Sequence, residues 1–215
     1  VAKNSEVYFN VADWAKNDFP ISKLTDGIKN AHKNFTTTNS LKEVSTQDVY
    51  LTLDGVYLID EIELYPAMQS VNGSLKYVGG FPVDYALSVW DGSKWCEVAA
   101  DSEVRIGDYE SADIVSSKKY RFSATDTNAI RLTVNKNSAV NKNETQFALR
   151  LAEIEVNGVK SSKTGFNSPT IISEYKSVGL SEAAAAADNK SVTYTFNKSY
   201  SVSEVILDGS NLSEF

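Results

Sequence analysis

The sequence contains a single cysteine and a single histidine among its 215 residues. Because Cys96 has no partner, an internal disulfide framework is impossible. His32 alone excludes a two-histidine metal site and weakens every catalytic scheme that needs histidine. The sequence also lacks an apolar run close to the roughly 20 residues that a membrane-spanning helix needs, so we predict no membrane span.

Positive charge is also scarce. The chain has 21 Lys and Arg against 28 Asp and Glu, which gives a net charge of -7. Nucleic-acid binding depends on neutralising phosphates with Lys and Arg, so we predict no nucleic-acid partner. The chain begins at Val1 without a charged and then apolar leader. We therefore expect a mature or trimmed piece from which any targeting signal has been removed.

Short runs rich in β-branched and aromatic residues dominate the first 160 residues, and helix patterns are scarce there. Two Asp-Gly pairs, at 54–55 and 91–92, predict hairpins between such runs. The predicted strands are 7–11, 49–53, 56–65, 83–90, 94–99, 120–123, 130–134 and 147–156. Many short strands separated by turns indicate an all-β fold, either an antiparallel sandwich or a barrel.

The composition changes after residue 158. Residues 159–170 are small and polar, which predicts a linker. Residues 192–207 then align without a gap on residues 49–64, so we predict that 171–215 begin a second β unit that repeats the opening hairpin. The alternative is that β-hairpins share this composition without being repeats. Ala183–Ala187 could form one or two helical turns, but a linker is the simpler interpretation.

Four motifs, in this order along the chain, resemble those of the discoidin or coagulation factor type C domain. They are Leu24-Thr25-Asp26-Gly27, Val49 to Pro66, Phe81 to Trp95, and Leu151-Ala-Glu-Ile-Glu-Val-Asn-Gly158. The resemblance covers residues 20–158, and the bacterial members of the family include carbohydrate-binding module family 32. It implies an antiparallel jelly-roll β-sandwich over residues 1–158 with a galactose-binding-like fold and a binding face made by loops at one end.

The resemblance also implies a structural calcium site. Asp26 and Glu153 would supply carboxylates and Ala152 a carbonyl, which are ligands that calcium prefers. The alternative is that Asp26 only forms a turn before Gly27 and that Glu153 is an ordinary charge at a strand end. The family usually follows Asp-Gly with Thr-x-Trp, whereas Phe35 stands in the Trp place here.

Two long connections are the candidate sugar-binding walls. In the family, the loop that corresponds to 135–143 touches sugar, and amides there can bond hydroxyls while an aromatic ring stacks on the sugar. A solvated loop is the alternative. The candidate residues are Asn137, Asn141 and Phe147 on this wall, and Tyr65, Asn72 and Tyr77 around the 66–80 connection. His32, in the loop after Asp26-Gly27 where the sequence differs from the family pattern, is a further candidate. Tyr109 is a weaker candidate.

Other conspicuous side chains have simpler interpretations. Glu61 and Glu63 alternate with Ile62 and Leu64, so we expect solvent-facing charges and not a catalytic acid pair. The resemblance places Trp95 on a core strand and leaves the role of Trp90 open.

The sequence therefore favours a non-catalytic glycan-binding module of a larger secreted bacterial protein, either a glycoside hydrolase or a surface adhesin. Its predicted partners are a glycan and the other domains of the parent chain, and its predicted location is extracellular or at the cell surface. The alternative is a structural or protein-adhesion spacer that binds no sugar.

Overall fold

A computed structural model of the chain describes residues 1–10, 19–38, 41–110, 115–171, 175–176, 180–185 and 192–196. The chain divides into two compact units, Val1–Ser177 and Val178–Phe215, which are described separately. Over the described residues, no helix is both long enough and apolar enough to cross a membrane.

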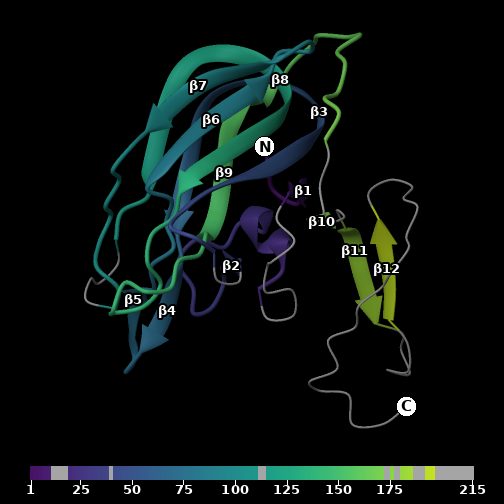
Figure 1. The fold of residues 1–215 in the computed structure, drawn as a ribbon. Helices are drawn as coiled ribbons and strands as arrows, with labels where there is room; N and C mark the ends of the chain where they lie inside the picture. The colour runs from purple at the N-terminus through teal and green to yellow at the C-terminus, as the bar shows by residue number, and fades with distance from the viewer. Residues whose placement is uncertain are drawn as a thin grey trace. The chain divides into compact units, whose positions relative to one another are not determined.

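In its described residues, the first unit is antiparallel β-structure with one short 3-10 helix (Figure 1). Its elements are β1 (Glu6–Phe9), η1 (Ile21–Thr25), β2 (Thr36–Thr37), β3 (Val44–Pro66), β4 (Met68–Val71), β5 (Ser74–Tyr77), β6 (Asp84–Trp90), β7 (Trp95–Asp101), β8 (Lys118–Lys136), β9 (Arg150–Lys160) and β10 (Tyr175–Lys176).

The two long strands β3 and β8 contribute to both layers of a sandwich. The first half of β3 lies between β1 and the second half of β8, in the order β10-β1-β3-β8-β6-β7. The second half of β3 lies between β9 and the first half of β8. Fully buried side chains, such as Leu51 and Leu132 from one layer and Ile62 and Ile154 from the other, fill the core. The predicted all-β jelly-roll sandwich is confirmed.

The hairpin predicted at Asp54-Gly55 is wrong. β3 runs through this pair without reversing, and its register against β8 shifts between Thr52 and Tyr57, so the pair lies in a bulge. A two-residue hairpin of this kind needs left-handed φ at both turn residues, and Gly55 does not adopt it. For the same reason, the strands predicted at 120–123 and 130–134 are one strand, since β8 follows β3 along both halves.

The hairpin predicted at Asp91-Gly92 is confirmed. Trp90 pairs with Trp95 across it, and Gly92 has a φ of 99°. The Asp91 carboxylate accepts hydrogen bonds from the backbone N–H groups of Ser93 (2.8 Å) and Lys94 (2.9 Å). Trp95 is half-buried and lies on the face of the layer opposite to Val89, so the expectation that it belongs to the core is wrong.

Residues 159–170, predicted as a linker, belong to the first unit and contact its sandwich. β9 continues to Lys160, the indole N–H of Trp90 donates to the carbonyl of Asn167 (2.8 Å), and the side-chain amide of Asn128 donates to the hydroxyl of Ser168 (3.0 Å). In the second unit, β11 (Leu180–Ala185) pairs antiparallel with β12 (Val192–Phe196), so the start of the alanine run is a strand. Residues 197–207, the rest of the proposed repeat, lie outside the described residues, and the second β domain stays a prediction.

Candidate functional site

Loops at one end of the sandwich line a cavity of about 860 Å³ that is open to solvent. Its first wall is the connection from β8 to β9, which contributes Ser138, Asn141 and Phe147 among others. Its second wall is the connection after β7, where residues 103–109 line the cavity. Tyr77 and Phe81 line it from the side of the core.

The predicted asparagines of the first wall are bonded within the protein, Asn137 to residues before and in β3 and Asn141 to its own loop. Asn137 is 1% exposed, and its amide group donates to the carbonyl of Lys42 (3.0 Å) and accepts from the side chain of Gln47 (2.5 Å). The Asn141 side-chain oxygen accepts hydrogen bonds from the backbone N–H groups of Thr145 (3.0 Å) and Gln146 (3.1 Å). Their role in the structure is therefore to shape the wall.

Phe147 supplies an aromatic surface to the cavity. It is half-buried, and its backbone forms isolated bridges with both Leu41 and Ala139. Because the backbone is fixed on two sides while the ring lines an open space, Phe147 is suited to contact a flat ligand.

Sequence reasoning missed most of the second wall. The Arg105 guanidinium forms an ion pair with Asp108, and the backbone N–H of Glu110 donates to the carbonyl of Tyr77 (2.8 Å). Lys142 of the first wall pairs with Glu110 at 3.4 Å, which links the two walls. The available signal was length, since the connection between β7 and β8 spans residues 102–117 and long connections in compact domains are often functional.

Acceptor groups remain at the cavity after its internal ion pairs are formed. Lys136 pairs with Glu43 at 3.5 Å, and Arg105 and Lys142 are paired as described above. Glu103 and Glu144 also line the cavity, and within the described part of the chain neither forms an ion pair. Both have left-handed φ values of 53°, as does Glu110, and such residues concentrate at binding sites. The cavity therefore presents carboxylates that can accept hydrogen bonds.

The second wall was predicted on the 65–77 connection, and only Tyr77 of that connection reaches the cavity. Tyr77 is 3% exposed and its hydroxyl accepts from the backbone N–H of Phe81 (3.2 Å), so its ring faces the core. Asn72 is exposed at the tip of the β4–β5 hairpin. His32 is exposed beside β4, where its Nδ1 accepts from the backbone N–H of Ser70 (2.8 Å).

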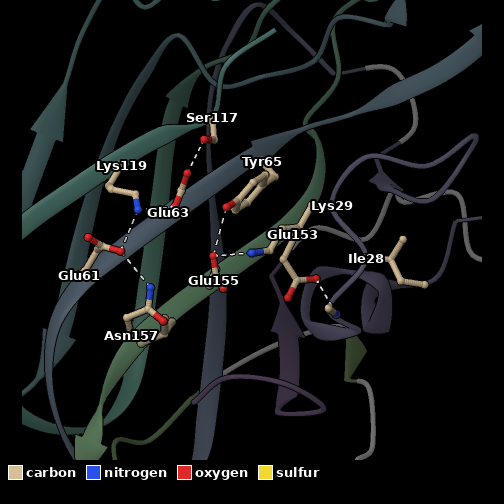
Figure 2. A network of polar contacts seen from close by, with 12 residues as sticks. Ile28, Lys29, Glu61, Glu63, Tyr65, Ser117, Lys119, Glu153, Glu155 and Asn157 are labelled. Carbon is tan, nitrogen blue, oxygen red and sulfur yellow. Dashed lines mark hydrogen bonds and ion pairs between the residues drawn. The ribbon is translucent and has the colours of Figure 1, made fainter. Parts of the chain in front are cut away.

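Tyr65 belongs to a polar network on the outer face of the β9 layer (Figure 2). Its hydroxyl donates to Glu155 (3.1 Å), and the ammonium group of Lys29 lies 4.8 Å from its ring centre and 2.7 Å from Glu155. This network is separate from the residues that line the cavity.

The same network contains Glu61 and Glu63. Hydrogen bonds from Asn157 and then Lys119 lower the pKa of Glu61 to about 2. Burial opposes ionisation of Glu63, but hydrogen bonds from Ser117 and Lys119 outweigh it and lower the pKa of that carboxyl. The expectation that Glu63 faces solvent is wrong, since it is 7% exposed beneath these partners. A glycosidase pair needs one carboxyl with a raised pKa, which this pair lacks.

The predicted metal ligands Asp26 and Glu153 lie on the two sides of Gly27. The backbone N–H of Gly27 donates to Glu153 (3.1 Å), and Asp26 accepts from the backbone N–H of Ile28 (2.7 Å) and the side chain of Asn34 (3.0 Å). Glu153 is 4% exposed, and burial raises its pKa to about 8, with the negative charge of Asp26 adding to the rise. The described residues contain no cluster of three or more His, Cys, Asp or Glu side chains suited to a metal. A buried carboxylate beside a second one is nevertheless an environment that a cation would stabilise.

No protein-family model matches the chain, and no curated protein sequence matches it. Solved structures do. CBM32-3 from a family 31 glycoside hydrolase of Clostridium perfringens is 16% identical, with a TM-score of 0.53 over 74% of this chain and 94% of that one. The unit has the fold of the family 32 carbohydrate-binding modules. Chitosan-binding module 2 of a chitosanase/glucanase from Paenibacillus sp. IK-5, solved with chitotriose, is 18% identical, with a TM-score of 0.51 over 73% and 98% of the two chains.

Proposed function

We propose that the first unit is a non-catalytic glycan-binding module whose site is the loop-end cavity. The observation that carries the proposal is the cavity itself, which combines the Phe147 ring with the carboxylates of Glu103 and Glu144. An aromatic face contacts the C–H groups of a sugar, and carboxylates accept hydrogen bonds from its hydroxyls. The carbohydrate-binding modules that share this fold support the assignment.

The affinity of such a site should be low. The cavity opens to solvent between loops. Polar groups of the two cavity walls and of the sugar must therefore give up hydrogen bonds to water before they bond to each other. Only the surplus over these costs appears as binding free energy. A module of this kind gains avidity when it is linked to other binding or catalytic domains.

Screening the full chain on a glycan array tests the proposal, followed by titration of variants against the sugar that binds best. Phe147→Ala should lose about 1–3 kcal/mol of binding free energy if the ring stacks on the sugar, with base–aromatic stacking as the nearest yardstick. Tyr65→Ala, which removes the aromatic candidate outside the cavity, is the matched control and should bind as the parent does. If no glycan binds, the spacer role takes the place of this proposal.

The calcium site belongs to the same proposal. Asp26 and Glu153 would hold the ion through their carboxylates and Ala152 through its carbonyl. The ion would neutralise two neighbouring negative charges, one of them buried, and so fix the Asp26-Gly27 loop against β9.

We further propose that the chain is part of a larger secreted protein of bacterial origin, a glycoside hydrolase or a surface adhesin, acting outside the cell or at its surface. The two structural neighbours described above are modules of a family 31 glycoside hydrolase and of a chitosanase/glucanase, both from bacteria, and this chain spans nearly all of each module. The remaining domains of such a parent would be its partners within the chain.

A further inference from the structure

A second cluster of aromatic side chains lies on the sheet face of the first unit, away from the cavity. Tyr50 of β3, Arg131 of β8 and Ser88 of β6 stand side by side in register, and Trp90 pairs with Trp95 across the β6–β7 hairpin. The neighbours Val49, Leu51 and Leu132 are fully buried in the core, so this row points outward. Tyr50, Trp90, Trp95 and Arg131 are half-buried and are called the outer-face cluster below.

The outer-face cluster has a defined geometry. The rings of Trp90 and Trp95 are 5.5 Å apart at 66°, and those of Tyr50 and Trp95 are 5.7 Å apart at 49°. The Arg131 guanidinium lies 5.0 Å from the centre of the Trp95 ring, at cation–π distance. Trp95 therefore has an aromatic or cationic neighbour on three sides.

Hydrogen bonds from residues that are not part of the outer-face cluster hold its side chains in place. The indole N–H of Trp90 donates to the carbonyl of Asn167 (2.8 Å), and its backbone N–H donates to the hydroxyl of Thr127 (3.1 Å). The Tyr50 hydroxyl donates to Asp48 (3.1 Å). Because these anchors fix the rings in the free protein, a ligand would not have to order them.

Arg131 lacks a carboxylate partner among the described residues, and unlike Arg150, which also lacks one but donates to Thr37 and to the carbonyl of Val78, it has no hydrogen-bond acceptor among them. Arg121 pairs with Glu61 at 2.8 Å and Arg105 pairs with Asp108, whereas Arg131 forms no ion pair with any described residue. Its Nε is shielded from solvent and has no acceptor. Asp48, the carboxylate nearby on β3, already accepts from Thr133 (2.6 Å) as well as from Tyr50. Because the buried Nε is out of reach of a ligand, an incoming carboxylate would bind the two terminal amino groups of the guanidinium, which have no carboxylate partner among the described residues.

We infer that the outer-face cluster is a second carbohydrate-binding surface, and that it takes a sugar residue that carries a carboxylate. Aromatic rings offer contact for the C–H face of a pyranose, and a guanidinium binds a carboxylate through two parallel hydrogen bonds. The net charge of -7 gives the chain no general attraction for anions. Binding of an acidic sugar would therefore report a local contact such as Arg131. This surface is independent of the loop-end cavity, and neither proposal requires the other.

Calorimetric titration of the full chain with an oligogalacturonate and with the same oligomer after methyl esterification tests the carboxylate directly in the unmodified protein. We expect the acid to bind at least about tenfold more tightly than the ester, the size of a lost charged hydrogen bond. Equal affinity for acid and ester would overturn the inference. So would the absence of binding to both an oligogalacturonate and an oligoglucuronate.

Variants locate the surface. Arg131→Gln and Trp95→Ala should each weaken binding of the acid about tenfold or more, and Arg131→Gln should not weaken binding of the ester further. Arg121→Gln is the matched control, because it removes an ion-paired arginine from the same strand in the other layer. Phe147→Ala should leave uronate binding unchanged, so failure of the cavity site and failure of this surface are distinguishable. Unchanged uronate binding in folded Arg131→Gln and Trp95→Ala proteins would contradict the assignment.

Discussion

Left-handed glycines allow the cavity walls to approach the sheet closely. Gly79 and Gly80 have φ values of 71° and 85°. A Cβ atom on Gly79 would overlap the carbonyl oxygen of Ala139, and one on Gly80 would lie 2.5 Å from the Cβ of Arg150. Ala139 belongs to the first wall of the cavity, so the position of that wall depends on the absence of a side chain at residue 79.

Gly79→Ala and Gly73→Ala form a matched pair of substitutions. Both glycines have left-handed φ, 71° and 83°, so alanine costs about 1 kcal/mol of backbone strain at each. Gly73 has no atom within 4 Å of an added Cβ, whereas Gly79 would press on Ala139. We expect Gly79→Ala to lower the free energy of unfolding by at least about 2 kcal/mol and Gly73→Ala by about 1 kcal/mol, measured by chemical denaturation. Equal losses would show that the wall moves freely.

The buried carboxyl of Glu153 gives a pH-dependent prediction. Its pKa rises from 4.5 to about 8 on folding, because burial disfavours the charged form. Between these values the folded state binds more protons than the unfolded state, so without calcium the free energy of unfolding should fall as pH rises through this window. Calcium should raise the melting temperature, most strongly at the upper end of the window, where the carboxylate is free to bind it.

Glu153→Gln should flatten this pH slope and abolish the calcium response in thermal melts with and without a chelator. Glu61→Gln is the control, since Glu61 lies in the same layer with its pKa lowered, and it should keep the calcium response. A calcium shift of equal size in Glu153→Gln would exclude this residue as a ligand. No shift in the parent protein, with no metal by elemental analysis, would end the proposal of a calcium site.

At the scale of elements, local turn chemistry predicts the hairpin correctly at one Asp-Gly pair and wrongly at the other. The hairpin at Asp91-Gly92 follows from its own residues, because Asp91 bonds the backbone that reverses. Asp54-Gly55 lies between runs that both pair with β8, a strand far along the chain, and nothing local in the sequence indicates that partner. The fold class was predictable from strand patterns and motifs, whereas the continuity of β3 was not.

Gly55→Ala tests the bulge against the turn. φ at Gly55 is not left-handed, and an added Cβ would meet only ordinary contacts, the nearest at 3.7 Å from Lys160. Alanine there should leave stability unchanged or raise it by about 0.5 kcal/mol, because the unfolded chain loses freedom. At Gly92, with a φ of 99° and the Phe166 ring 3.2 Å from an added Cβ, alanine should cost about 1–2 kcal/mol. Similar losses in the free energy of unfolding at both positions, measured by urea denaturation, would contradict the bulge and support a hairpin at Asp54-Gly55.

Of the two walls of the candidate site, the first was predictable from the sequence and the second was not. The resemblance located the first wall and Phe147, because the order of motifs places the 135–147 connection at the loop end. The second wall consists of charged residues such as Arg105 and Asp108, which form their ion pair without any periodic pattern in the sequence. The burial of Tyr77 depends on its hydrogen bond with Phe81 and on core packing, which composition does not reveal.

At the scale of the whole molecule, the first unit extends beyond the segment that resembles the discoidin domain. β10 pairs with β1 through Tyr175 and Lys176 and so covers an edge of the sheet. Phe166 and Asn167 pack against the β6–β7 hairpin, where they contact Gly92 and Trp90. The segment after residue 158 therefore stabilises the layer that carries the outer-face cluster.

Truncated chains ending at Ser177 and at Gly158 test this extension. The chain ending at Ser177 retains β10 and the contacts of Phe166 and Asn167, so we expect it to unfold cooperatively at the melting temperature of the full chain's first transition. The chain ending at Gly158 loses the end of β9, the hydrogen bond to the Trp90 indole and the edge strand. Each kcal/mol lost shifts the melting temperature of a unit this size by about 2–4 °C, so a fall of several degrees is expected. Its tryptophan emission should also shift to longer wavelength, because Trp90 becomes more exposed. If both truncated chains melt together with the same emission, residues 159–170 are a linker as the sequence predicts, and the sandwich ends at Gly158.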